Sequence, residues 1–184
     1  ATTIFVQQGL SVTETLEATK ASILAVNAAN LSFADATELI TVAVNSFGLS
    51  FEDATSVIDK LTTIADSSAA SVNDLTQILR RSGAAAATAG LSLDEFAAIT
   101  ATVRESTRLS STTIGAGMKT ILVGVQQNEK VLGEYGIQVR KSNGEMVSTM
   151  EIIRRISSRW QSLSKEQRVN LAATVAGKRR FTEF

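Results

Sequence analysis

Gly90-Leu91-Ser92-Leu93-Asp94-Glu95 is the stretch that decides the fold, because it describes the end of one helix and the start of the next. Glycine tolerates the left-handed conformation that often ends a helix. The Ser92 hydroxyl can accept a hydrogen bond from the free N–H groups of a first turn. Glu95, three residues later, can bond back to the serine N–H. The stretch therefore predicts a tight joint between two helices.

The same spacing of serine and carboxylate occurs five times in the first half of the chain. The five helix-cap joints are Ser11–Glu14, Ser32–Asp35, Ser50–Asp53, Ser71–Asp74 and Ser92–Glu95. Their serines are 21, 18, 21 and 21 residues apart, and three joints are preceded by Gly-Leu. Such regular spacing predicts a repeated helix-turn-helix array.

Between the joints, the apolar residues follow a helical period. Residues 36, 39, 40, 43, 44 and 47 form one apolar stripe, and residues 54, 57, 58, 61, 64 and 65 form another. Each stripe predicts one buried helix face. The chain contains no proline, which fits nearly continuous helix with short connections.

The pattern changes after residue 109. Residues 110–134 predict one longer helix, in which Gly115, Gly117 and Gly124 would allow a neighbouring backbone to approach closely. Alternating apolar residues around Asn143-Gly144 predict a small β-hairpin at 137–147. Helices are expected again at 149–161 and 164–176. The predicted class is all-α: an array of short antiparallel helices, one longer helix and this hairpin.

Charge divides the chain into two halves of opposite sign. Residues 1–100 hold 11 acidic and four basic residues, a net charge of −7, and residues 101–184 hold seven acidic and 14 basic residues, a net charge of +7. We therefore distinguish an acidic array, 1–109, from a basic part, 110–184. We expect them to form one continuous unit that is a fragment of a longer chain. The asymmetry favours either oriented self-association or an unevenly charged, solvated surface.

Composition argues against an enzyme. The chain has no histidine and no cysteine, so a histidine-based triad and the usual zinc sites are excluded. We expect no cofactor and no metal. Gly115-Ala116-Gly117 lacks the frame of a phosphate loop, and Lys119 stands at the wrong offset. The acidic residues of the first half are expected to be structural, because they stand at helix starts.

Three minor interpretations remain open. The small-residue run at 83–90 could belong to a membrane-active ejection domain, although a packed helix end explains it more simply. Glu129 or Glu134 could serve a peptidoglycan lyase. Lys178-Arg179-Arg180 and the arginines before it could contact DNA phosphates, although a solvated basic face or a contact with the acidic helices of another copy is favoured.

The order of these motifs resembles the conserved core of phage tail tape-measure proteins, the minor tail family of long-tailed phages. The resemblance covers residues 9–181. It rests on the Gly-Leu-Ser joints, the stretch Gly115-Ala116-Gly117-Met118-Lys119-Thr120-Ile121-Leu122, the segment from Leu132 to Gly144, and Ala176-Gly177-Lys178-Arg179-Arg180.

The resemblance implies a very long, mostly helical protein that lies inside the tail tube of the virion in a few parallel copies. Its length would set the length of the tail, and it would leave before the DNA. Partners would be other copies of itself, the tail tube, the tail tip or baseplate, assembly proteins and the host envelope membrane, with no sequence-specific nucleic acid. The interrupted apolar stripes differ from an extended coiled coil, so this part would be a folded core of that protein.

Overall fold

The computed structural model describes residues 2–177, and within that range it contains ten α-helices and one short 3₁₀ helix. The predicted all-α class is confirmed for this part of the chain. The helices are α1 (Thr2–Gln7), α2 (Val12–Ala29), α3 (Phe33–Phe47), the 3₁₀ helix η1 (Phe51–Asp53), α4 (Ala54–Asp66), α5 (Val72–Thr88), α6 (Leu93–Thr107), α7 (Ser111–Gln127), α8 (Glu129–Glu134), α9 (Thr149–Trp160) and α10 (Lys165–Ala176).

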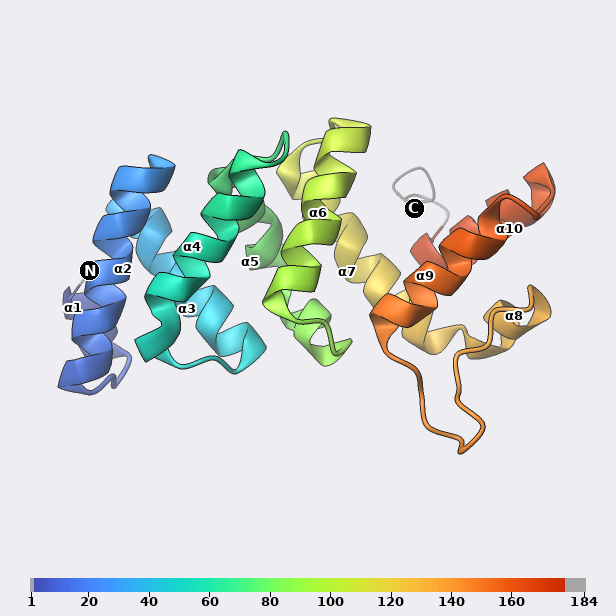
Figure 1. The fold of residues 1–184 in the computed structure, drawn as a ribbon, viewed down its shortest axis with the longest axis horizontal. Helices are drawn as coiled ribbons and strands as arrows, with labels where there is room; N and C mark the ends of the chain where they lie inside the picture. The colour runs from blue at the N-terminus through green and yellow to red at the C-terminus, as the bar shows by residue number, and fades with distance from the viewer. Residues whose placement is uncertain (1, 178–184) are drawn as a thin grey trace.

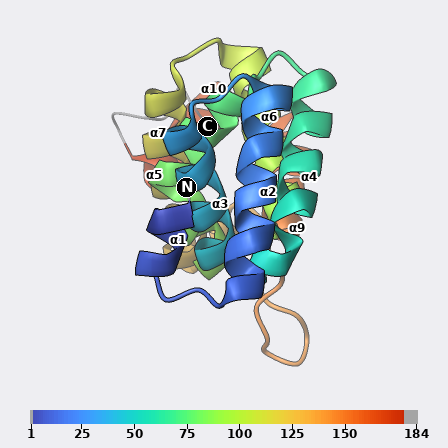
Figure 2. The same cartoon turned by 90° about the vertical axis from the view of Figure 1, so that its left-hand side faces the viewer.

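The first seven helices alternate between two layers. Helices α2, α4 and α6 lie side by side in one layer, and α3, α5 and α7 lie behind them in the other (Figure 1). The view from the end shows α1 in the layer of α3 (Figure 2). Each helix therefore packs on its partner in the other layer and on the next helix of its own layer. This arrangement is a stack of helix pairs, as in α-solenoids.

The two layers explain why the joints come in two kinds. The Gly-Leu-Ser joints at Ser11, Ser50 and Ser92 lead into α2, η1–α4 and α6, which share one layer. The joints at Ser32 and Ser71 lead into α3 and α5 of the other layer. The structural repeat is therefore a pair of helices, and its length is about twice the spacing between successive joints.

The three glycine joints share one backbone geometry. Gly9, Gly48 and Gly90 all have a positive φ, between 62° and 83°. In each joint, the leucine N–H donates to the carbonyl five residues earlier, with N···O distances of 3.0–3.3 Å. This is the bonding pattern of a Schellman motif, which satisfies a carbonyl left free at a helix end. Glycine is needed here because the left-handed conformation is costly for other residues.

Aromatic contacts connect each helix pair to the next pair. The ring of Phe5 in α1 lies 6.2 Å from that of Phe51, which begins η1. The ring of Phe47 at the end of α3 lies 6.0 Å from that of Phe96 in α6. In both cases, a helix of one layer covers the start of the helix that belongs to the following pair. These contacts define the stacking interface between pairs.

The buried apolar side chains form two clusters that meet in α7. The first extends from Phe5 to Leu122 and the second from Ile121 to Ala176. Helix α7 packs along α5 on the side of the array and against α9 and α10 on the other side. The change of sequence pattern after residue 109 falls in the loop before α7, whereas the boundary between the two apolar clusters falls within that helix.

The structure corrects two sequence predictions. The longer helix predicted for 110–134 breaks at Asn128, so α7 and α8 are separate and α7, with 17 residues, is shorter than α2. The Asn128 side chain donates to the carbonyl of Gly124 at 2.8 Å, a local bond that competes with helix continuation.

The β-hairpin prediction at 137–147 is wrong. The segment is a loop with one isolated antiparallel bridge, Arg140 to Met146, and no strand is assigned within it. Two strands with no third strand beside them are only marginally stable. Ile137, Val139 and Val147 are instead buried in the second cluster.

Candidate functional site: capped joints, close helix contacts and an apolar end groove

Four of the five predicted joints place the serine directly before a helix, with its hydroxyl bonded to the N–H three residues later. Ser11, Ser71 and Ser92 form complete capping boxes with Glu14, Asp74 and Glu95. At the joint Ser32–Asp35, the Asp35 N–H donates to the Ser32 hydroxyl at 3.1 Å, and that hydroxyl donates to the Asp35 carboxylate at 2.6 Å. The carboxylates are therefore occupied by local bonds.

The joint at Ser50 differs from the predicted pairing. Ser50 is the N-cap residue of η1, and its hydroxyl accepts a hydrogen bond from the N–H of Glu52 at 3.1 Å. Asp53 instead occupies the N-cap position of α4, and its side chain makes no capping bond there. The extra 3₁₀ turn brings Phe51 into contact with Phe5, so tertiary packing overrides the cap.

Asp74 connects the starts of two helices and the end of a third. Its carboxylate accepts from the Ser71 N–H at 3.1 Å and from the Ser111 hydroxyl at the start of α7. Arg104 of α6 lies 3.4 Å away. Burial raises the pKa of Asp74, but the bonds from Ser111 and Ser71 and the charge of Arg104 outweigh it, so the pKa lies below its ordinary value. Sequence reasoning found the cap but not Ser111 or Arg104.

Two of the three predicted packing glycines lie where α7 touches other helices. A Cβ on Gly115 would stand 2.9 Å from Cβ of Arg81 and 3.2 Å from the carbonyl oxygen of Ile78, both in α5. A Cβ on Gly124 would overlap the backbone of Val175 in α10. Gly117 is also buried in α7. Close approach therefore requires glycine at both contacts.

The loop around Asn143 and Gly144 is held by the Arg140 side chain and by two backbone bonds, in which the N–H of Val147 donates to the carbonyl of Val139 at 2.9 Å and the N–H of Lys141 donates to the carbonyl of Glu145 at 2.8 Å. The Arg140 guanidinium makes two bonds to the Glu129 carboxylate, at 2.7 and 2.9 Å, and a third to the carbonyl of Gly144 at 2.9 Å. Asn143 Oδ1 accepts from the N–H of Glu145 at 3.1 Å.

The two carboxylates considered for a lyase are poorly placed for acid catalysis. The bond to Arg140 lowers the pKa of Glu129, whereas a general acid at neutral pH needs a raised pKa. Glu134 ends α8 and is exposed to solvent. Neither residue has the buried environment that tunes catalytic carboxylates.

The small-residue run at 83–90 lies at the end of α5 and in the joint that follows. Gly83 and Ala86 are buried, and a Cβ on Gly83 would come 3.4 Å from the Ser46 hydroxyl of α3. In the range 2–177, no helix is long and apolar enough to cross a membrane. The described residues also hold no group of three acidic side chains placed to bind a metal ion. Lys178-Arg179-Arg180 lies outside the described residues.

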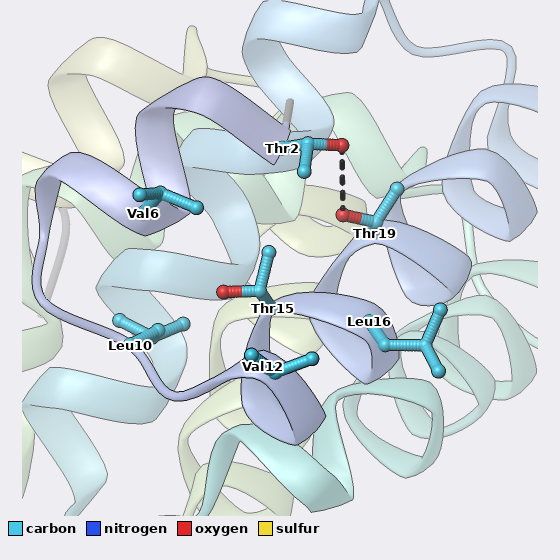
Figure 3. Close-up of a pocket in the computed structure, with 7 residues that line it drawn as sticks. All are labelled: Thr2, Val6, Leu10, Val12, Thr15, Leu16 and Thr19. Atoms are coloured by element: carbon cyan, nitrogen blue, oxygen red, sulfur yellow. Dashed lines mark hydrogen bonds between the residues drawn. The ribbon is translucent and has the colours of Figure 1, made fainter.

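An apolar groove that the sequence reasoning did not anticipate lies between α1 and α2. It has a volume of about 410 Å³. Val6, Leu10, Val12 and Leu16 line it together with Thr2, Thr15 and Thr19 (Figure 3). Helices α1 and α2, between which the groove lies, stand at the N-terminal end of the stack (Figures 1 and 2).

A family model described as "phage-related minor tail protein" matches residues 1–177. The chain belongs to this family. The expected phage-tail family is thus confirmed, and this minor tail protein has a structural role in the tail of the virion. Such a family is typically non-enzymatic, in agreement with carboxylates that serve caps and ion pairs. No solved structure matches the chain.

Proposed function

We propose that this minor tail protein is a folded segment of the tape measure, which sets tail length during assembly and is expelled when the genome is ejected. The observation that carries the proposal is the stack of short capped helices within a chain of the phage minor tail family. Its partners would be other copies of the chain, the tail tube, the tail tip or baseplate, and assembly proteins.

The folded form limits how much length this segment can add. A continuous helix rises about 1.5 Å per residue, so 176 residues in one rod would span roughly 260 Å. The longest helix here has 18 residues, which corresponds to about 27 Å. The stack therefore stores chain compactly, and extended helical parts of the same protein would act as the ruler.

The stack also suits a protein that must leave through a narrow tube. Contacts run mainly between neighbouring helices, and the chain has no cysteine, so no disulfide links distant parts. Stacked repeats can unfold unit by unit. Expulsion would therefore proceed from one end of the stack.

Purified phage particles test both parts of the proposal. We expect peptides from residues 9–177 in intact tails and their loss from tails that have released DNA, with a tube protein as the internal control. Deleting these residues should shorten tails by far less than deleting an equally long rod segment, measured by electron microscopy. A chain that stays in emptied tails, or shortening by about 1.5 Å per deleted residue, would contradict the proposal.

The alternative is a membrane-active ejection domain. It requires the α5 end to leave its contacts with α3 and enter a bilayer. Leakage of dye from liposomes, measured between pH 5 and 8, is its direct test.

A further inference from the structure

The loop between α8 and α9 carries an Asn-Gly pair that neither forms the predicted hairpin nor serves the proposed function. Of the seven asparagines in the sequence, Asn143 is the one that a glycine follows. Residues 140–146 around it are all exposed to solvent. The remaining asparagines lie within helices or next to a helix end: Asn27, Asn30, Asn45, Asn73, Asn128 and Asn170.

An asparagine followed by glycine can lose its side-chain amide without an enzyme, and asparagine is one of the thermolabile residues of proteins. The main-chain nitrogen of the glycine attacks Cγ of the asparagine, so an N–Cγ bond forms and the Cγ–Nδ2 bond breaks. Hydroxide takes the proton of the attacking N–H, and Nδ2 leaves as ammonia with a proton from water. Water then opens the cyclic imide at either carbonyl, which gives aspartate or isoaspartate. The net reaction consumes water and releases ammonia.

The geometry of the loop favours attack on Cγ of Asn143. Its Oδ1 accepts from the N–H of Glu145 at 3.1 Å, so the side chain folds back along the main chain in an Asx turn. Negative charge develops on Oδ1 during the attack, and an N–H that already points at this oxygen stabilises that charge. The space beside the attacking residue is open, because a Cβ built on Gly144 would meet no atom of the described residues within 4 Å.

One hydrogen bond in the loop opposes the reaction. The Gly144 N–H, which must lose its proton, donates to the carbonyl of Lys141 at 3.0 Å. This bond lies in an exposed turn, where water replaces a lost partner at little cost. The other asparagines are held in helices or helix ends, and each is followed by a residue whose side chain crowds the attacking nitrogen. Reaction in the folded chain is therefore expected at Asn143.

We propose that Asn143 is a site of spontaneous deamidation in the folded chain, and that its product opens the loop between α8 and α9. The proposal is independent of the tape-measure role. A hydrogen bond from Asn143, followed by one from Lys141, holds the pKa of Glu145 below its ordinary value, so the amide of Asn143 faces a carboxylate. Aspartate at position 143 replaces this donor by a second negative charge, and like charges repel.

Isoaspartate changes the loop further, because it inserts a side-chain carbon into the main chain. The insertion displaces Gly144, whose carbonyl accepts from the Arg140 guanidinium at 2.9 Å. It also disturbs the bond from the Lys141 N–H to the carbonyl of Glu145, which is 2.8 Å long. Both contacts hold the ends of the loop together. The loop thus changes its charge and its order with the age of the chain.

Incubation of the whole folded chain at neutral pH tests the site. Mass spectrometry of its peptides measures conversion at each asparagine, chromatography separates aspartate from isoaspartate, and a fresh sample corrects for conversion during digestion. We expect conversion at Asn143 to be about tenfold faster or more than at any other asparagine, because a tenfold factor needs only a small difference in barrier. Conversion at Asn143 that is as slow as at the helical asparagines overturns the site.

The variant Asn143→Gln is the matched control for the chemistry. It keeps a neutral amide, but its longer side chain would have to form a six-membered ring, which is a slower reaction. We expect no conversion at position 143 of this variant under the same conditions. Circular dichroism checks that the wild type and the variant remain folded during incubation.

Hydrogen exchange of residues 137–147 measures the consequence for the loop. We expect severalfold faster exchange in the incubated wild type than in the fresh wild type, and no change with incubation in Asn143→Gln. The variant Asn143→Asp carries the new charge without the longer main chain, so its exchange should lie between those of the fresh and the incubated wild type. Equal exchange in fresh and converted wild type overturns the opening of the loop.

Discussion

Gly124→Ala is the substitution whose effect follows most directly from the packing of α7 on α10. The added Cβ would overlap the carbonyl oxygen of Val175 and stand 2.8 Å from its carbonyl carbon and 3.1 Å from its Cα. All three are backbone atoms, so no rotation of a side chain can relieve the contact. The two helices must move apart, which loosens the second apolar cluster around Val125 and Val175.

The expected loss combines two opposing terms. Overpacking a close contact costs about 1–3 kcal/mol, and a contact with backbone lies at the upper end of that range. Alanine in place of glycine within a helix returns about 1 kcal/mol. We expect Gly124→Ala to lower the free energy of unfolding by about 2 kcal/mol. For a chain of this size, that is a fall of about 4–8 °C in Tm.

Gly133→Ala is the matched control. Gly133 lies in α8, and a Cβ there meets no atom within 4 Å. This variant should gain up to about 1 kcal/mol. Urea unfolding measures both variants, and hydrogen exchange should show the loss for Gly124→Ala concentrated in α10. If Gly124→Ala is as stable as the wild type, α7 and α10 do not approach as closely as described.

Other substitutions test the remaining contacts. Gly115→Ala should destabilise the chain less than Gly124→Ala, because its nearest contact, with Cβ of Arg81, is 2.9 Å long, whereas the Cβ at position 124 overlaps the carbonyl oxygen of Val175; urea unfolding measures the difference. Ser92→Ala should cost about 1 kcal/mol through the lost capping box, and an unchanged unfolding midpoint would contradict it. The pKa of Asp74 in the folded chain lies below its ordinary value of 3.8, so the ionised carboxylate stabilises the fold at pH values above 3.8. This stabilisation is lost as the pH falls through the pKa of the folded chain. Asp74→Asn should therefore make the free energy of unfolding depend less steeply on pH in the acidic range. Arg140→Ala should speed proteolysis within 137–147 and leave the array intact.

The local parts of the fold could be predicted from the sequence because they depend on neighbouring residues. A serine, the carboxylate three positions later and the preceding glycine lie within six residues, and their bonds form within one joint. The stripes on α3 and α4 likewise identify the buried faces, including Leu39, Ile40, Val57 and Ile58.

The parts that depend on distant contacts could not be predicted. Nothing near Asp74 indicates that Ser111, 37 residues later, would donate to it. The sequence of α2 does not reveal that Leu24 and Val26 pack against the core whereas Val12, Leu16 and Ile23 are exposed. The break at Asn128 depends on its bond to Gly124 and on the nearby backbone of α10, 46 residues away at Thr174. The alternation of Gly-Leu-Ser with plain serine joints, by contrast, was visible and indicates the two-helix repeat.

The local character of the joints also bears on how such a chain can evolve. Each glycine joint satisfies its own hydrogen bonds within a few residues, and successive ones are separated by either 39 or 42 residues, from Ser11 to Ser50 and from Ser50 to Ser92. The length of a helix pair can thus differ by three residues while the helices keep their alternation between the two layers. A recombination event that starts and ends at glycine joints would add or remove a whole helix pair in register. The number of helix pairs in this region could then change in complete structural units.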